Sequence, residues 1–107
     1  MEVISEYKGG HLRLRLTGEL DHHTAREGWN GIESALDRYL PRSCALDLSA
    51  LSFMDSSGIA VIFRLRNRTR ETGVRFWLAD PAPQCARVLA ASGIERFGSI
   101  RKGEKEK

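Results

Sequence analysis

The stretch from Asp47 to Phe63 places the strongest constraint on how this 107-residue chain folds. Its pattern is an apolar strand, a short loop, two serines and a glycine, and then a helix with one apolar face. The hydroxyls of Ser56 and Ser57 therefore lie where a helix begins, beside unpaired backbone N–H groups and the positive end of the helix dipole. Such a position accommodates added negative charge, including a phosphate attached to a serine. The stretch predicts an α/β domain with a chemically switchable helix start.

Strand and helix patterns alternate along the rest of the chain without a linker. Leucines at 12, 14 and 16 alternate with polar residues, which predicts a strand with one buried face. Thr24 and Glu27 fit a capping box at the start of a helix that Pro41 stops. We expect strands at 3–7, 11–17, 44–48 and 74–79, and a last short strand or packed coil at 97–100. Helices are expected from Thr24 to the stop at Pro41, from about 57 to 71, and from the turn at 80–83 to Gly93. The order β-β-α-β-α-β-α favours a mixed β-sheet with helices packed on it.

Composition and charge narrow the class of protein. With 41% hydrophobic residues the chain can bury a core as one domain, which we place at residues 1–100. The net charge of +3 comes mainly from residues 101–107, a charged tail that we expect to be disordered; without it the net charge is +1, so nucleic acid is not an expected partner. No apolar run is long enough to cross a membrane, and residues 1–7 carry an early acidic residue and no apolar signal core. We therefore expect a cytoplasmic protein without a membrane partner. Cys44 and Cys85 then fit buried thiols in a reducing compartment, with a disulfide as the lesser alternative.

Three segments resemble one bacterial family. Asp47-Leu-Ser49 followed by Phe53-Met-Asp-Ser-Ser-Gly58 resembles the signature of STAS domains, and more narrowly that of the anti-sigma factor antagonists, or anti-anti-sigma factors. Gly18-Glu-Leu-Asp21 with Thr24 resembles a second family segment, and residues 73–78 fit a third. The resemblance covers residues 2–97 and implies a STAS-type α/β fold. Asp-Ser-Ser-Gly alone is a weak motif, but between a strand and an apolar helix it is fairly specific.

The resemblance implies a partner-switching regulator of transcription that has no catalysis of its own and no cofactor. In that family the unphosphorylated antagonist binds an anti-sigma factor, which is also an ATP-dependent serine kinase, and the bound sigma factor is released. The kinase phosphorylates the antagonist and so dismisses it, and a separate serine phosphatase restores it. The family phosphoserine maps onto Ser57. The resemblance also implies partner contacts at Asp21, His22, His23, Thr24, Asp55, Ser56, Ser57 and Gly58.

The C-terminal part departs from the family pattern. Family members continue past the segment that matches Phe97 into another helix, where this chain has Gly98-Ser-Ile-Arg101 and the charged tail. Either that helix is dispensable, or a partner or second subunit covers the surface that it leaves. We expect a monomer or a weak dimer.

Several other interpretations stay open on the sequence. The Asp-Ser-Ser-Gly segment can be no more than a helix cap, with Ser56 a packed hydroxyl. Within the same fold, the chain can be a STAS subunit of another signalling or transport assembly. A small serine hydrolase needs His22 or His23, an aspartate and Ser57 to converge, although the Gly-x-Ser-x-Gly elbow is missing.

Two further clusters have competing interpretations. A metal site built from His11, His22, His23 and Asp21 lacks a Cys/His spacing signature, so solvated loop residues are the favoured interpretation and no metal is expected. Four arginines form two ridges on one predicted helix. They predict either a solvated surface or an acidic partner, and the ridges are Arg64 with Arg68 and Arg66 with Arg70.

Overall fold

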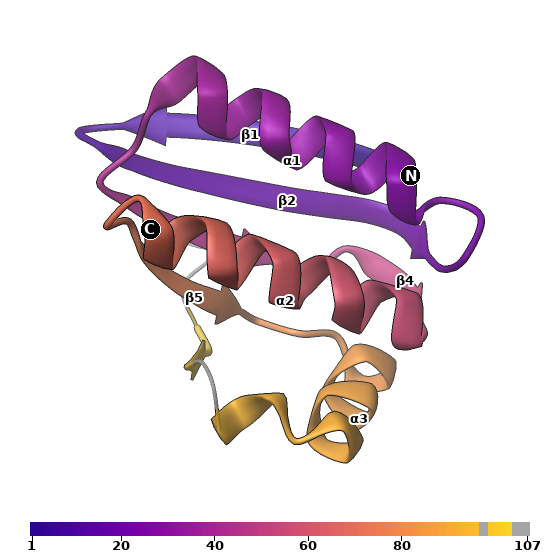
Figure 1. The fold of residues 1–107 in the computed structure, drawn as a ribbon. Coiled ribbons are helices and arrows are strands. Elements are labelled where there is room, and N and C mark those ends of the chain that lie inside the picture. The colour runs from indigo at the N-terminus through magenta and orange to yellow at the C-terminus, as the bar shows by residue number, and fades with distance from the viewer. Residues whose placement is uncertain (97–98, 104–107) are drawn as a thin grey trace.

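The computed structural model describes residues 1–96 and 99–103. In those residues six strands form one sheet, accompanied by three α-helices and a 3-10 helix (Figure 1). In chain order the elements are β1 (Glu2–Lys8), β2 (His11–Leu20), α1 (Ala25–Tyr39), β3 (Ser43–Asp47), β4 (Leu51–Met54), α2 (Ser56–Glu71), β5 (Arg75–Ala79), α3 (Pro83–Ser92), η1 (Ile94–Arg96) and β6 (Ile100–Arg101).

The strands follow the order β1-β2-β3-β5-β6, and β4 pairs with the end of β2. β1 and β2 form an antiparallel hairpin around Gly9 and Gly10, whereas the other pairs are parallel. Since β2, β3 and β5 are added in one direction across the sheet, right-handed crossovers place α1 and α2 on the same face. The two helices lie side by side, with α3 next to α2 at the edge of the molecule (Figure 1).

The core lies between this face of the sheet and the helices. The leucines of β2 at 12, 14 and 16 are fully buried while the arginines between them are half-buried, as the alternation predicts. β3 is buried along its whole length because it is central and covered on both faces. The helices contribute the apolar residues of their inner stripes, namely Trp29, Ile32, Ala35 and Leu36 from α1 and Val61, Ile62 and Leu65 from α2.

The predicted fold class is confirmed, with one short strand, β4, that the pattern did not include. β4 has only four residues and only its two ends are buried, so it carries too little alternation to be recognised. Ile100 and Arg101 form β6 beside β5, whereas Phe97 and Gly98 lie outside the described residues. Of the expected tail the structure describes 101–103, so the boundary placed at residue 100 stays a prediction.

The face of the sheet opposite α1 and α2 holds a cluster of charges that we call the charged face, defined by Arg13, Arg15, Asp47 and Asp80. Asp47 is fully buried, and its Oδ2 lies 3.1 Å from Arg13 Nη2 and 3.6 Å from Arg15 Nε. Asp80 Oδ2 lies 3.5 Å from the same Arg13 nitrogen. Burial raises the pKa of Asp47, but hydrogen bonds from Ser49 and the charge of Arg13 outweigh it, so the pKa lies below its ordinary value.

The two cysteines are buried and free, as expected for thiols in the core. Cys44 lies in β3 and Cys85 in α3. Burial raises the pKa of Cys44 to about 12 and also raises that of Cys85. Both thiols are therefore protonated and poorly reactive in the folded protein.

Candidate functional site

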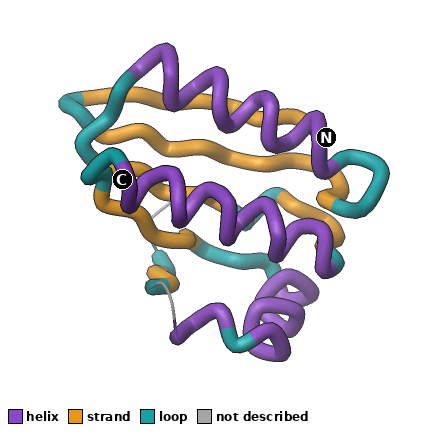
Figure 2. The backbone as a smooth tube through the Cα atoms, in the orientation of Figure 1, coloured by secondary structure: helices purple, strands orange, loops and turns teal. Residues whose placement is uncertain are grey.

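Two segments far apart in the sequence meet at one end of the sheet. β2 and β4 are paired at their carboxyl ends, with Leu20 opposite Met54, and the N–H of Asp55 donates to the carbonyl of Leu20 at 3.4 Å. Residues 21–24 follow β2 and residues 55–58 follow β4, so the two segments lie at the same end of the molecule (Figure 2). All eight residues implied as partner contacts belong to these segments. Their contact with a partner stays a prediction.

The loop after β2 is held by Asp21. Its Oδ1 accepts the N–H groups of His23 at 2.9 Å and Thr24 at 3.2 Å. Burial raises the pKa of Asp21, but these hydrogen bonds lower it by more, so its pKa lies below the ordinary value. His22 and His23 are exposed beside it, with their rings edge to face at 5.5 Å.

The predicted capping box at Thr24 is wrong. The Thr24 hydroxyl donates to the carbonyl of Glu19 at 2.7 Å and accepts the N–H of Asp21 at 3.0 Å, and it makes no cap bond to α1. The hydroxyl is therefore used to close the loop rather than to start the helix. The sequence did not indicate Glu19 and Asp21 as partners of this hydroxyl, because the loop geometry decides which backbone groups lie near it.

Asp55 begins α2, so the interpretation as a helix cap is correct for this residue. Its Oδ1 accepts the N–H of Ser57 at 2.8 Å, and its carbonyl accepts those of Gly58 at 2.9 Å and Ile59 at 3.4 Å. Ser56 is exposed and Ser57 is partly buried. In the described residues the Ser57 hydroxyl makes no hydrogen bond, so capping leaves it available for chemistry.

Gly58 seats the start of α2 directly against the strands. A Cβ at this position would overlap Met54 Cγ and would lie 3.2 Å from Leu20 Cδ2, which is tighter than most real Cβ contacts. Only glycine permits this approach without rearrangement. The close packing at Gly58 therefore sets the distance between the first turn of α2, which includes Ser57, and the ends of β2 and β4.

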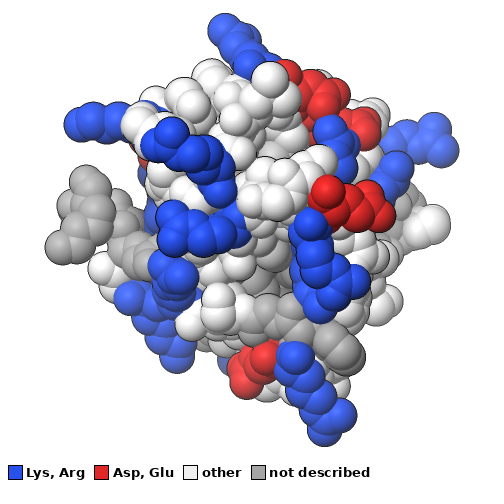
Figure 3. Space-filling model, turned by 60° about the vertical axis from the view of Figure 1, so that its left-hand side comes forward, with Lys and Arg blue, Asp and Glu red and all other residues white. Residues whose placement is uncertain are grey.

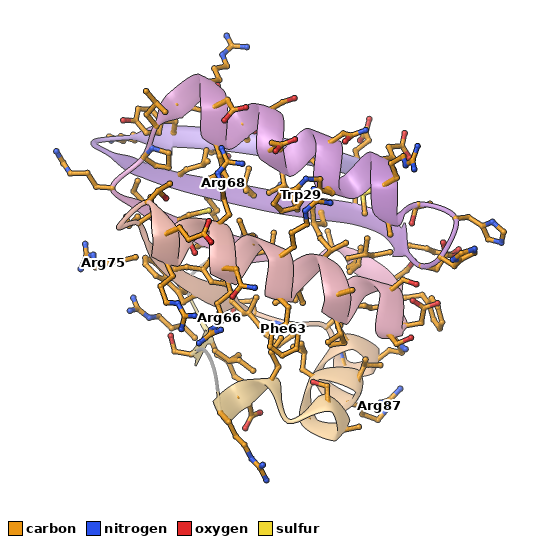
Figure 4. The ribbon with its side chains drawn as sticks, viewed as in Figure 1. Trp29, Phe63, Arg66, Arg68, Arg75 and Arg87 are labelled. Carbon is orange, nitrogen blue, oxygen red and sulfur yellow. The ribbon has the colours of Figure 1, made fainter. Side chains whose placement is uncertain are left out.

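A groove of about 620 Å³ opens beside Ser57 between α1 and α2. Trp29 lies between the two helices (Figure 4), and the Arg64 guanidinium carbon is 4.4 Å from the centroid of its ring. The groove is lined by Ala25, Arg26, Trp29, Asn30, Glu33, Ser57, Ala60, Val61 and Arg64. The sequence did not indicate this groove: of its lining residues it singled out Ser57 and Arg64, without showing that α1 faces them.

The arginine ridges of α2 separate into two environments. Arg68 reaches from α2 to α1, with Nη1 at 3.2 Å from Glu33 Oε2 and Nη2 at 2.6 Å from Asp37 Oδ1, so it ties the helices together (Figure 4). Arg66 and Arg75 lie on the other side of α2 (Figure 4). Figure 3 brings the end of the molecule away from Ser57 forward, and Lys and Arg side chains are spread over it. The excess of positive charge is therefore not confined to the candidate site.

The alternative chemistries have no assembled site in the described residues. No hydrogen bond joins His22 or His23 to Ser57 in this part of the chain, and His11 stacks on Trp77 instead, with ring centroids 5.2 Å apart. Groups of three or more possible metal ligands are absent from residues 1–96 and 99–103. Among the helices described, none is both long and apolar enough to cross a bilayer.

Comparison with known proteins places this geometry in a family. The family model of the STAS domain matches residues 2–106. A Paenibacillus polymyxa protein named anti-sigma F factor antagonist is 33% identical over 104 residues, which are 97% of this chain and 89% of that protein. The anti-sigma factor antagonist SpoIIAA in its unphosphorylated form is similar in structure, with a TM-score of 0.80 at 25% identity over 98% of this chain and 90% of that one. Its phosphorylated form, from Bacillus, gives a TM-score of 0.73 at 25% identity and covers 98% and 94% of the two chains. The chain belongs to the STAS-domain family.

Proposed function

We propose that this protein is an anti-sigma factor antagonist controlled by phosphorylation of Ser57. In its unphosphorylated state it binds an anti-sigma factor that has serine kinase activity, and the sigma factor held by that partner is released. The Ser57 hydroxyl then accepts the γ-phosphoryl group of ATP in the partner's active site, ADP leaves, and the modified protein dissociates. A serine phosphatase returns it to the binding form.

The observation that carries this proposal is the position of Ser57. It lies in the first turn of α2, next to the 21–24 loop, and its hydroxyl is not used by the cap that Asp55 provides. The relative from Paenibacillus polymyxa and the two SpoIIAA structures support the class of partner. The protein acts by binding, and Ser57 is a substrate position rather than a nucleophile of its own active site.

The charge added at Ser57 is large enough to end a protein interaction. A phosphoserine carries about −1.5 to −2 charges near neutral pH. At an effective dielectric constant of ~20, one pair of unit charges 4 Å apart interacts by ~4 kcal/mol. Placing the phosphate against an acidic or apolar partner surface then costs ~3–4 kcal/mol, which weakens binding by roughly 100- to 1,000-fold.

The fold itself withstands the modification. The N–H of Ser57 is already held by Asp55, so the start of α2 does not depend on the hydroxyl. Gly58 keeps the turn seated on the strands. We therefore expect a change in surface charge with little change in backbone structure, and an unaltered helical circular dichroism signal checks this.

The deciding experiment combines the purified protein with serine-kinase anti-sigma factors from the same genome and Mg-ATP. Intact mass and fragment mapping then locate the phosphoryl group. We expect one modification on Ser57, absent from Ser57→Ala and retained in the matched variant Ser56→Ala. Ser57→Ala should still bind the anti-sigma factor, because it removes only the acceptor hydroxyl.

A second comparison isolates the charge. Ser57→Asp should weaken binding to the anti-sigma factor, whereas the neutral variant Ser57→Asn, of nearly the same shape, should bind much more tightly than the aspartate variant. Equal affinities for the two would refute the electrostatic explanation. If no anti-sigma factor binds or modifies the wild-type protein, the chain is instead a STAS subunit of another assembly.

A further inference from the structure

The start of α2 has little capacity left to neutralise a phosphate on Ser57. The N–H groups of Ser57, Gly58 and Ile59 already donate to Asp55, through its side chain or its carbonyl. The Asp55 carboxylate itself lies beside Ser57 and repels a second anion. A free helix start attracts anions through unpaired donors, but here most of those donors are occupied. The helix start alone therefore offers little stabilisation to a phosphate at this position.

The groove between α1 and α2 supplies cationic side chains. Arg26 lies in the first turn of α1, as Ser57 does in α2, and both side chains line the groove. In the described residues Arg26 makes no ion pair, and Arg64 makes none besides its contact with the Trp29 ring. Glu33, the acidic residue of the groove, is already paired with Arg68. The part of the groove near Ser57 thus has unneutralised positive charge.

Trp29, which lines the same groove, carries a buried hydrogen-bond donor that has no partner in the described part of the chain. Its side chain is 5% exposed, and within the described residues its indole Nε1–H has no acceptor. A buried donor without a partner is costly and leaves a positive dipole directed at nearby groups. Arg26 and Arg64 are the two cationic residues that line the groove with Trp29, so the donor and both guanidinium groups belong to one part of the fold.

We propose that the phosphate on Ser57 is bound within the protein itself, by Arg26 across the groove between α1 and α2. Arg64 contributes charge from farther along α2, because helix side chains lean toward the N-terminus and therefore toward Ser57. This inference rests on the proposed phosphorylation of Ser57 and adds the residue that holds the modified state. The phosphate is thereby drawn onto α1 instead of projecting freely into solvent.

The test measures the second pKa of the phosphate by ³¹P NMR in protein synthesised with phosphoserine at position 57. This route needs no kinase, so failure of the proposed function and failure of this inference are distinguishable. We expect Arg26→Gln to raise that pKa by about half a unit, and the double variant with Arg64→Gln to raise it further. About 0.5 M NaCl should reduce the difference between Arg26→Gln and wild type.

A matched variant separates local binding from general charge. Arg87→Gln on α3 removes the same charge from an exposed side chain outside the groove (Figure 4) and should leave the phosphate pKa unchanged. All variants retain His22 and His23, so the comparison between variants cancels any contribution of these side chains. The inference is wrong if Arg26→Gln leaves the pKa unchanged, or if Arg87→Gln shifts it as much.

Discussion

Replacing Asp47 with Asn tests how strongly the charged face stabilises the fold. The Asp47 carboxylate is fully buried, 3.1 Å from Arg13 and 3.6 Å from Arg15, and it accepts the N–H of Ser49 at 2.9 Å. Asn keeps the shape and one acceptor oxygen but removes the charge. The half-buried Arg13 guanidinium then loses the negative charge of Asp47 that balances its own positive charge.

The magnitude follows from opposing contributions. At an effective dielectric constant of ~20, each of the two pairs contributes ~5 kcal/mol of attraction before solvation is considered. Relief of carboxylate desolvation offsets most of this, and breaking a buried pair from one side costs ~3–5 kcal/mol in other proteins. Because Asn retains the bond to Ser49, we expect Asp47→Asn to lower the free energy of unfolding by about 2–3 kcal/mol. In a chain of this length that lowers Tm by ~10 °C.

The assay is urea unfolding at pH 7 and near pH 3, with Asp37→Asn as the matched control. Asp37 also pairs with an arginine, at 2.6 Å, but its side chain is 63% exposed, so its loss should cost under ~1 kcal/mol. The folded pKa of Asp47 is lowered. Its stabilisation is therefore present above the unfolded pKa of ~3.9 and lost as the pH falls through the folded value. The gap between wild type and Asp47→Asn should narrow at low pH. A gap under ~0.5 kcal/mol at pH 7, or one that widens at pH 3, would refute the reasoning.

Three further outcomes are expected at other positions. Cys44 and Cys85 should resist a thiol reagent at pH 8 in the folded protein, because burial raises their pKa values. Both should react in denaturant, and fast labelling of the native protein would contradict this prediction. Asp55→Ala should lower the free energy of unfolding by ~1 kcal/mol through loss of the cap on Ser57, measured by urea unfolding, and no loss would mean that the cap is not used in solution. Gly58→Val should cost about 2–3 kcal/mol in the same assay, since a side chain there overlaps the strands, and wild-type stability would show that α2 is not seated as described.

The sequence was most informative where one physical requirement dominates. The leucines at 12, 14 and 16 need one buried face, so their alternation identified β2. Asp55 was a candidate cap because its side chain has few other partners at a helix start. Thr24 misled because its hydroxyl can bond several nearby backbone groups, and the loop geometry selects the carbonyl of Glu19.

The groove at the candidate site could not be predicted because it depends on how two helices pack. Trp29 and Arg26 belong to α1 and Ser57 to α2, and no local pattern states which faces of separate helices meet. Arg64 was visible as part of a ridge, yet its contact with Trp29 needs the crossing of α1 and α2 to be known. Tertiary packing thus decides the surroundings of Ser57, while the sequence indicates its place at a helix start.

The close seating of Gly58 on β4 has a consequence for timing. Under the proposed function, the serine is presented on a turn whose position the strands already determine, so this turn does not have to rearrange before the ester forms. Phosphorylation of a serine on such a turn does not have to wait for the loop motions that take microseconds to milliseconds in other proteins. The phosphorylation state of each molecule then persists for as long as its phosphoester bond does. The rates of the kinase and the phosphatase alone determine how quickly that state changes.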